Sequence, residues 1–322
     1  MKRQFLKTLT ASALCAAASL AGLGAMAQEA YPNKPIRVIV PYAAGGADTY
    51  IRPLQAALEK QHGMNWVIET VVGAGGTIGA NQVKRAQPDG YTILFCGSGA
   101  LTIAPVLQNM NLSARDFAFI VNLVTIPYVI AVRPEAPYRT AAGFIDFVKR
   151  NPGKLSYGSA GIGSAPHLGM EALAASAKSS LVHVPYNGIA ASVPALLGGH
   201  IDVVIGAPSA IMPHVRSGKL VALGVTSKER FAPLPEVPAL AEAGVDVNVA
   251  THFGFLAPKG TPQAVLDKFA AAVRDAAREP AFVTAMATLQ NRIDMLPADE
   301  YLKAIEAEAA DFAPVIAKSL KP

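Results

Sequence analysis

Short runs rich in valine and isoleucine alternate with helical patterns along most of this chain. Strand-like runs occur at 36–40, 66–69 and 91–95, and helical patterns follow the first two, at about 48–61 and 78–86. This order is typical of a mainly parallel sheet with helices on both faces. The sequence therefore predicts an α/β fold.

The same pattern restarts in the second half. A helix is expected near 141–150. Strands are expected at 155–157, 181–184, 201–205 and 221–226, with helices between them at 167–177, 190–197 and 208–217. About 295 residues outside the N-terminal segment are too many for one small core and suit two lobes.

Two extended runs separate the halves, near 125–132 and 249–256. They suit two passages of the chain between lobes, which is the geometry of a hinge. We therefore expect lobe 1 to hold residues 28–127 and 251–322, and lobe 2 to hold residues 128–250. The helical tail at 263–318 should pack back on lobe 1.

The first 27 residues have the pattern of a secretory signal peptide. Lys2, Arg3 and Lys7 precede an apolar run that ends in Ala-Met-Ala at 25–27, so cleavage is expected before Gln28. The alternative is a retained membrane anchor, because residues 8–28 carry no charge. A signal peptide predicts export to the periplasm.

Charge and cysteine content exclude several kinds of partner. The net charge of +5 includes Lys2, Arg3 and Lys7, so removing these three charges leaves +2. A charge this small gives no reason to expect nucleic acid as a partner. Cys96 would remain as a single thiol, which cannot form an internal disulfide and is expected to be a small buried apolar residue.

A glycine pair follows the first expected strand, in Pro-Tyr-Ala-Ala-Gly-Gly-Ala-Asp at 41–48. Glycines between a strand and a helix let backbone N–H groups approach a ligand, and the helix N-terminus favours an anion. Asp48 can cap this helix or orient an ordered water. The alternative is an ordinary turn. The candidate ligand-binding residues here are Tyr42, Gly45, Gly46, Ala47 and Asp48.

A second glycine loop occupies the equivalent place in the other half, Tyr-Gly-Ser-Ala-Gly-Ile-Gly-Ser-Ala-Pro-His at 157–167. Its candidate residues are Ser159, Gly161, Ser164 and His167. The alternative is a flexible loop with a capping serine. Two such loops that faced each other would hold an anion from both sides.

Two further strand ends point to the same place. Tyr186 and Gly188 follow the strand at 181–184, where His183 is more simply a structural residue, and Pro208 follows the strand at 201–205. Ligands of open parallel sheets bind beyond the carboxyl ends of the strands, so these loops predict one cleft.

Catalytic and cofactor motifs are absent from the sequence. No serine stands in a Gly-x-Ser-x-Gly elbow, no phosphate-binding loop occurs, and the histidines lack zinc-site spacing. We expect no enzyme activity, no cofactor and no metal. A periplasmic hydrolase remains the alternative class.

Nine segments together resemble the substrate-binding receptors of tripartite tricarboxylate transporters, also called Bug proteins. They are YPNKPIRVIVPYAAGGAD at 31–48, GAGGTIGA at 73–80, PDGYT at 88–92, GKLSYGSAG at 153–161, VHVPYNG at 182–188, LGGHID at 197–202, SGKLVALGVTS at 217–227, LPEVP at 234–238 and GFLAP at 254–258. The sequence departs from the family pattern at Ala43-Ala44 and at Glu69-Thr-Val-Val72.

The resemblance implies a two-lobed periplasmic-binding-protein (Venus flytrap) fold. It implies a receptor that captures a small organic acid and delivers it to the membrane subunits of a tripartite transporter. It also implies that backbone donors of the two glycine loops hold a ligand carboxylate, and it adds Ser98, after the third strand, to the site. We expect a monomer. The alternative ligand is a neutral ring amide, since neutral donors discriminate weakly between an amide and a carboxylate.

Overall fold

The computed structural model describes residues 31–186, 188–245 and 247–319. The chain divides into a short N-terminal unit, Met1–Lys34, and a large unit, Pro35–Pro322, that contains the helices and strands given below. The signal peptide expected at 1–27 lies outside the described residues. No helix within the described ranges is long and apolar enough to span a bilayer.

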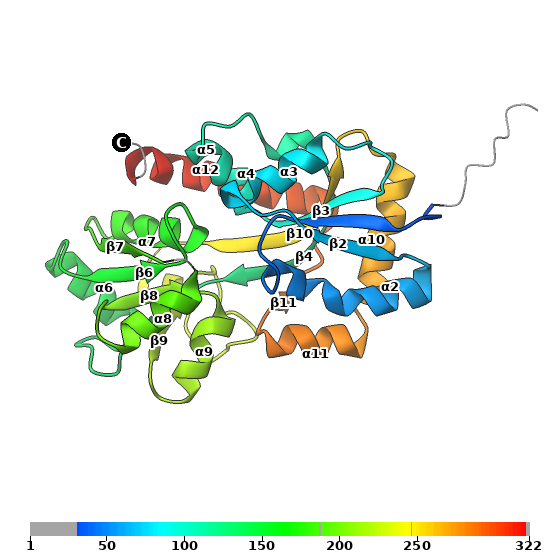
Figure 1. Ribbon diagram of the computed structural model, residues 1–322. Helices are drawn as coiled ribbons and strands as arrows, with labels where there is room; N and C mark the ends of the chain where they lie inside the picture. The colour runs from blue at the N-terminus through cyan, green and yellow to red at the C-terminus, as the bar shows by residue number, and fades with distance from the viewer. Residues whose placement is uncertain (1–30, 187, 246, 320–322) are drawn as a thin grey trace, which may run out of the picture. The chain divides into compact units, whose positions relative to one another are not determined.

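The first sheet has six strands in the order β11-β4-β10-β3-β1-β2 (Figure 1). Strand β1 is parallel to β2 and β3, whereas β10 is antiparallel to β3 and β4, and β11 is antiparallel to β4. The strands are β1 (Ile36–Val40), β2 (Trp66–Thr70), β3 (Thr92–Gly97), β4 (Phe117–Pro127), β10 (Ala250–Pro258) and β11 (Arg292–Ile293).

The second sheet has five strands in the order β7-β6-β8-β5-β9, drawn in shades of green in Figure 1. Strand β6 is parallel to β7 and β8, and β5 is antiparallel to β8 and β9. The strands are β5 (Val129–Val132), β6 (Ser156–Ser159), β7 (Val182–Pro185), β8 (Val203–Gly206) and β9 (Val221–Val225).

Both sheets are therefore mixed, and the expectation of mainly parallel strands holds only for the strand–helix–strand repeats. The antiparallel pairs all involve the strands at the two crossings, β4, β5 and β10. Within the strand–helix–strand repeats, a crossover helix makes successive strands parallel. A strand that enters from the other sheet has no such helix before it, so it can run antiparallel to its neighbours.

The crossings lie at the two extended runs of the sequence. Only Tyr128 separates the end of β4 from the start of β5, and β10 returns beside β4. On this partition of strands we propose that residues 28–127 and 251–322 form one lobe and residues 128–250 the other.

Helices cover both sheets. Those of the first half are α2 (Gln55–His62), α3 (Thr77–Lys84), α4 (Gly99–Thr102) and α5 (Ala104–Leu107), with short 3-10 turns η2 (Ala47–Tyr50), η3 (Arg52–Leu54), η4 (Ala74–Gly76) and η5 (Ala114–Asp116). The second sheet carries α6 (Ala141–Arg150), α7 (Ala165–Ser176), α8 (Ile189–Leu197), α9 (Pro208–Arg216) and η6 (Leu240–Ala243). The C-terminal helices are α10 (Gln263–Ala276), α11 (Pro280–Thr288) and α12 (Ala298–Ser319).

The helix expected at 48–61 is broken. Residues 47–54 form two 3-10 turns, and the α-helix begins only at Gln55. Pro53 has no N–H to donate, so a regular helix cannot run through this segment without a missing bond.

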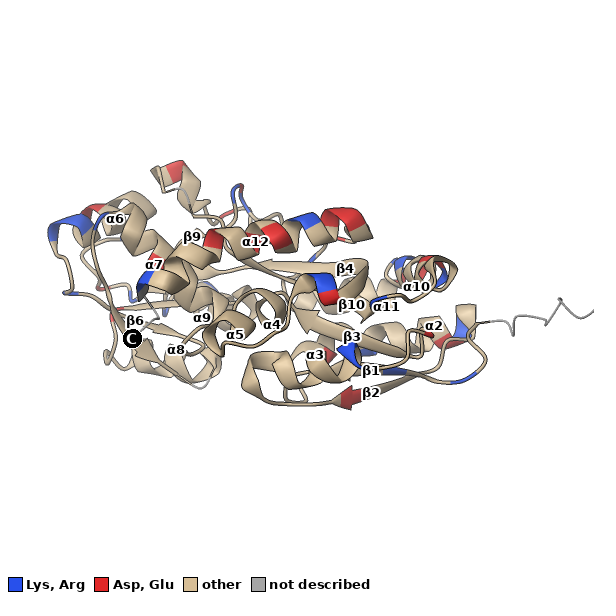
Figure 2. Ribbon diagram, turned by 90° about the horizontal axis from the view of Figure 1, so that it is seen from above, with Lys and Arg blue, Asp and Glu red and all other residues tan. Residues whose placement is uncertain are grey.

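Helix α12 packs on both sides of the crossings, and not on the first sheet alone as expected. It contacts β4 and α4, and it also contacts α7 of the second half. Phe312 and Ile316 are buried in the same apolar cluster as Leu168 and Val249. Acidic residues outnumber basic ones along this helix (Figure 2).

Candidate ligand-binding site

The first glycine loop offers backbone donors at the end of β1. Gly46 N–H donates to the Ala43 carbonyl at 3.2 Å, which closes a turn. Gly45 has a φ of +83°, a conformation that glycine adopts most easily. The N–H groups of Gly45, Ala47 and Asp48 donate to no atom of the described residues. These three donors are free to meet an anion.

The expected helix dipole contributes little here, because η2 is only four residues long. A macrodipole is the sum of many aligned peptide units, so a single 3-10 turn supplies its local N–H groups and little more. The anion-binding capacity of this loop therefore rests on individual N–H donors.

Asp48 does not cap the helix. Its side chain is buried, with an exposed fraction of 1%, and Oδ2 accepts a hydrogen bond from Arg52 Nε at 2.7 Å. Oδ1 is buried and has no hydrogen-bond partner in the described part of the chain. A buried oxygen of this kind calls for a donor, so it can accept from a ligand N–H or O–H.

Tyr42 connects the first glycine loop to β3. Its hydroxyl accepts from Gly97 N–H at 3.1 Å and lies 3.4 Å from the Gly97 carbonyl, and its ring meets the edge of Phe253. Burial raises the pKa of Tyr42 well above its usual value. Both bonds join the loop to β3, which leaves Tyr42 a positioning role.

Ser98 also lies behind the loops. Its side chain is fully buried, and its Oγ accepts from His252 N–H at 3.3 Å. Burial raises the pKa of Glu308 to about 7, and the neighbouring Ser98 hydroxyl opposes part of that rise. Ser98 thus contacts its protein neighbours, and we assign it a supporting role.

The second glycine loop is held by its own side chains. Ser159 Oγ accepts from Gly161 N–H at 3.1 Å and lies 2.8 Å from His183 Nε2. Ser164 donates to the Gly161 carbonyl at 2.7 Å, and it caps α7 by accepting from His167 N–H. The structure therefore brings Ser159, Gly161, Ser164 and His167 together in one network.

Two stacked histidines underlie this network. The rings of His167 and His183 lie 3.8 Å apart, nearly parallel, and Tyr157 stacks on His183. Burial lowers the pKa of both histidines to about 4, so both are neutral near pH 7. His167 Nδ1 accepts from Gly163 N–H at 3.0 Å, which places the ring proton on Nε2.

Tyr186 and Gly188 join the second loop, whereas no hydrogen bond among the described residues links Pro208 to it. Gly188 N–H donates to the Ala160 carbonyl at 3.3 Å, and the Tyr186 carbonyl lies beside Gly161. Pro208 opens α9 directly after β8. Its place at a strand end matches the sequence argument, but no described contact links it to the other candidates.

The two groups of candidates are connected through α4 and α5. These short helices follow Ser98, and the Leu107 side chain lies against Gly163, so closely that a Cβ at Gly163 would collide with it. No hydrogen bond among the described residues joins the first loop directly to the second. The expectation that the two loops face one ligand thus remains a proposal.

Sequence reasoning missed three contributors. Arg52 neutralises Asp48, and the signal was its spacing of four residues on an expected helix. Gly163 N–H donates to His167 Nδ1, and His183, expected to be structural only, lies 2.8 Å from Ser159 Oγ. The alternation Val-His-Val at 182–184 indicates which face of its strand His183 occupies, but it does not indicate that Ser159 is its partner.

The Ser159–His183 pair has the spacing of a nucleophile and a base. However, Ser159 is fully buried, and no carboxylate hydrogen-bonds to His183 in the described ranges. A triad needs that third group to orient the base. The residues described also contain no cluster of three or more metal-ligating side chains.

Comparisons with known proteins agree on one family. The model of the tripartite tricarboxylate transporter family receptor matches residues 50–319. A curated relative from Pseudomonas sp. strain P51, encoded between tcbD and tcbE, is 36% identical over 81% of this chain and 79% of its own length. A solute-binding protein of the same family from Polaromonas has a TM-score of 0.81 and 28% identity, covering 89% of this chain and 99% of its own.

Three further solved structures are similar. The periplasmic binding protein BugD is 32% identical with a TM-score of 0.73, covering 89% of this chain and 98% of its own. MatC of Rhodopseudomonas palustris, solved with malate, is 28% identical with a TM-score of 0.73, covering 89% of this chain and 100% of its own. Another protein of that organism, solved with adipate, is 25% identical with a TM-score of 0.74, covering 89% and 97%.

These likenesses extend over both sheets and confirm the two-lobed α/β periplasmic-binding-protein fold. They also confirm the resemblance seen in the sequence motifs. The family is a class of solute-binding receptors. The chain belongs to the tripartite tricarboxylate transporter receptor family.

Proposed function

We propose that this protein is a periplasmic receptor that captures a small carboxylate between the two glycine loops and delivers it to the membrane subunits of a tripartite transporter. The observation that carries the proposal is the set of free N–H groups at Gly45, Ala47 and Asp48, at the carboxyl end of β1. Such donors suit a carboxylate oxygen. The ligands of two similar structures, malate and adipate, are both dicarboxylates.

The second loop supplies the opposite wall in this proposal. The N–H groups of Gly161, Gly163 and His167 are already bonded to Ser159, His167 and Ser164, so these bonds fix the shape of the loop and are not free donors for the ligand. A preorganised loop loses little entropy on binding. Closure of the lobes would then follow from tighter binding to the closed state. In this role the protein acts as an exported monomer, cleaved before Gln28.

The proposal is tested by substituting Gly45 with aspartate. Gly45 lies in open space, so Gly45→Asp adds a negative charge beside the free donors without a clash. We expect it to abolish the thermal stabilisation by malate or adipate, which at 100 times the dissociation constant is about 2.7 kcal/mol in the native protein. A full shift in the Gly45→Asp protein would contradict the site.

Gly218→Asp is the matched control. Gly218 also has a positive φ, +71°, and open space around it, but it lies at the far end of α9 from Pro208. Both substitutions should lower the free energy of unfolding by about 1 kcal/mol, the cost of a side chain in the left-handed region. Only Gly45→Asp should remove ligand binding.

A neutral amide is the second candidate ligand, and the unpaired Asp48 Oδ1 favours it, because that oxygen could accept from an amide N–H. Adipate and adipamide differ only in this group. Tighter binding of adipate than of adipamide supports a carboxylate as the ligand. Tighter binding of adipamide would instead make a neutral amide the proposed ligand.

The hydrolase alternative rests on the 2.8 Å separation of Ser159 Oγ and His183 Nε2. The receptor proposal predicts no turnover of esters or amides. Turnover that Ser159→Ala abolishes would overturn the receptor proposal.

A further inference from the structure

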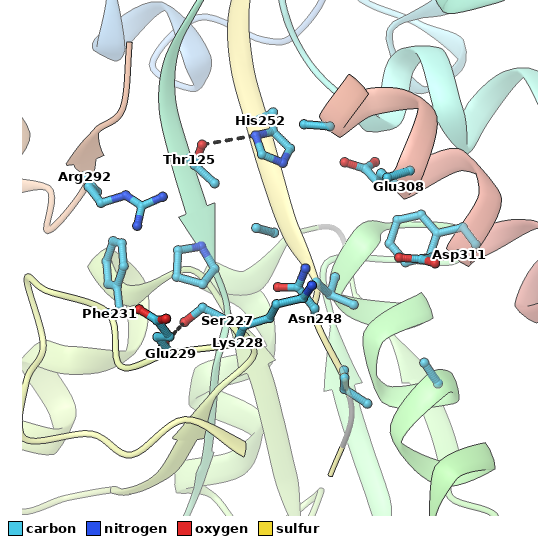
Figure 3. A pocket seen from close by; sticks show the side chains of 18 of the residues that line it. Thr125, Ser227, Lys228, Glu229, Phe231, Asn248, His252, Arg292, Glu308 and Asp311 are labelled. Atoms are coloured by element: carbon cyan, nitrogen blue, oxygen red, sulfur yellow. Dashed lines mark hydrogen bonds between the residues drawn. The ribbon is translucent and has the colours of Figure 1, made fainter. Parts of the chain in front are cut away.

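A cavity of about 770 Å³ lies beside the crossing strands, and no residue of either glycine loop is among those that line it (Figure 3). Strands β4 and β10 form one wall, α12 forms another, and the segment 227–231 lies at its mouth. We call it the crossing cavity. Its size is within the range of small-molecule sites in proteins.

Glu308 lies at the inner end of the crossing cavity. It is 9% exposed, and Oε1 accepts from the Thr102 hydroxyl at 2.7 Å. Oε2 is buried and has no hydrogen-bond partner within the described residues. Figure 3 shows the carboxyl group directed from α12 toward His252 across the cavity. A buried carboxylate oxygen without a donor is costly, unless a ligand supplies one.

His252 provides a second acceptor. Thr125 donates its hydroxyl hydrogen to Asp294 Oδ2 at 2.5 Å, so its oxygen must accept from His252 Nδ1 at 3.1 Å. Burial lowers the pKa of His252, which keeps the ring neutral. With the proton on Nδ1, Nε2 carries a lone pair. Figure 3 shows this second ring nitrogen on the side of the ring nearer Glu308.

The remaining charges leave the cavity suited to a cation. Arg292 and Arg230 line it, but Arg292 is paired with Asp294 at 3.0 Å and Arg230 with Glu242 at 2.8 Å. Lys228 also lines the cavity, and Figure 3 shows its side chain extending toward Asn248 and away from Glu229. The lining carboxylates of Glu229, Glu308 and Asp311 outnumber this one cation. The inner end therefore presents acceptors and negative charge.

Apolar side chains surround the acceptors. Phe312 and Val249 are buried and line the cavity together with Pro127 and Ala250. A ligand that fits needs one compact donor group and a short apolar body. A primary ammonium has three N–H donors and can meet both acceptors at once.

We propose that the crossing cavity binds a small organic ammonium compound, whose N–H groups donate to Glu308 Oε2 and His252 Nε2 and whose apolar body packs on Phe312 and Val249. This site is separate from the glycine loops and does not depend on the carboxylate function.

The probe is butylammonium, titrated into the protein from Gln28 onward at pH 8 by calorimetry. Burial raises the pKa of Glu308 to about 7, so its carboxyl is charged at this pH. We expect saturable binding at one site, and no binding of butanol, which has a similar body and no charge. Failure of butylammonium to bind, or equal binding of butanol, would overturn the proposal.

Glu308→Gln should weaken butylammonium binding at least about tenfold, because it removes a charge-assisted hydrogen bond while keeping the shape. Glu306→Gln is the matched control on the same helix. Glu306 pairs with Arg115 and does not line the crossing cavity, so its substitution should leave the affinity unchanged. Equal affinities for Glu308→Gln and Glu306→Gln would refute the site.

A second measurement does not depend on the stability of a variant. In the native protein, butylammonium should shift the NMR resonances of the His252 ring and leave those of the His200 ring, on the surface beyond α8, unchanged. The Gly45→Asp protein should still bind butylammonium, which separates this site from the carboxylate site. Loss of butylammonium binding in Gly45→Asp, or an unmoved His252 ring, would contradict the proposal.

Discussion

The His167 and His183 rings show how single residues set the chemistry of the second loop. They stack at 3.8 Å, and His167 accepts from the Gly163 N–H through a nitrogen that must carry a lone pair. Protonation of that nitrogen would replace an acceptor by a donor. The loop geometry therefore requires a neutral imidazole, which burial provides by lowering the pKa of each ring to about 4.

We predict that this pair makes the protein sensitive to acid. The histidine pKa is about 6.5 in the unfolded chain and about 4 in the folded protein, so the unfolded state binds more protons below pH 6.5. The contribution of the two neutral histidines to the free energy of unfolding is complete above pH 6.5 and is lost as the pH falls toward 4. The free energy of unfolding, measured by urea denaturation, should fall over this window.

His167→Gln should flatten that pH dependence, whereas His200→Gln, at an exposed position, should not. Glu308 contributes with the opposite sign, because its raised pKa of about 7 favours the protonated carboxyl in the folded state. Its contribution is lost as the pH rises toward 7, so each histidine variant must be compared with the native protein at every pH. Equal slopes for His167→Gln and the native protein would contradict the role of the pair.

At the scale of helices and strands, local patterns predicted most elements and failed where distant contacts decide. Helix α6 begins after Thr140 and ends at Arg150 as expected, because a capping threonine and an apolar face are local signals. The antiparallel entry of β10 beside β3 is not local and was missed. The ends of the expected strands predicted the candidate loops, but the sequence did not predict which side chains contact each other. The hydrogen bond between Thr102 and Glu308, for example, joins residues that are 206 positions apart.

Two helix caps give a matched test at this scale. Ser164 caps α7 and Thr140 caps α6, each by accepting a backbone N–H. Ser164→Ala and Thr140→Ala should each lower the free energy of unfolding by about 1 kcal/mol. Only Ser164→Ala should also weaken carboxylate binding, because Ser164 holds the Gly161 carbonyl at 2.7 Å. Calorimetric titration with adipate measures this; equal affinities in the two variants would show that Ser164 does not order the loop for binding.

At the scale of the whole large unit, one residue joins both crossings. Thr226 N–H donates to the Tyr128 carbonyl, and its hydroxyl oxygen accepts from Tyr128 N–H, both at 2.9 Å. The Thr226 carbonyl accepts from Val249 N–H at 2.9 Å, and the hydroxyl donates to the Val249 carbonyl. Tyr128 leads from β4 into β5, and Val249 leads into β10, so Thr226 ties together the two passages between the sheets.

We predict that Thr226→Val destabilises the protein although valine matches the shape of threonine. The substitution leaves the Tyr128 N–H and the Val249 carbonyl without their hydroxyl partner in a buried place, which should lower the free energy of unfolding by about 1–3 kcal/mol. Thr226→Ser keeps the hydroxyl and loses only a methyl group, at about 1 kcal/mol. Because the hydrogen bonds of Thr226 given above go to Tyr128 and Val249 and not to the glycine loops, both variants should still be stabilised by adipate in thermal unfolding. If Thr226→Val proves as stable as Thr226→Ser, the hydroxyl does not hold the crossings, and the backbone bonds alone join the two passages.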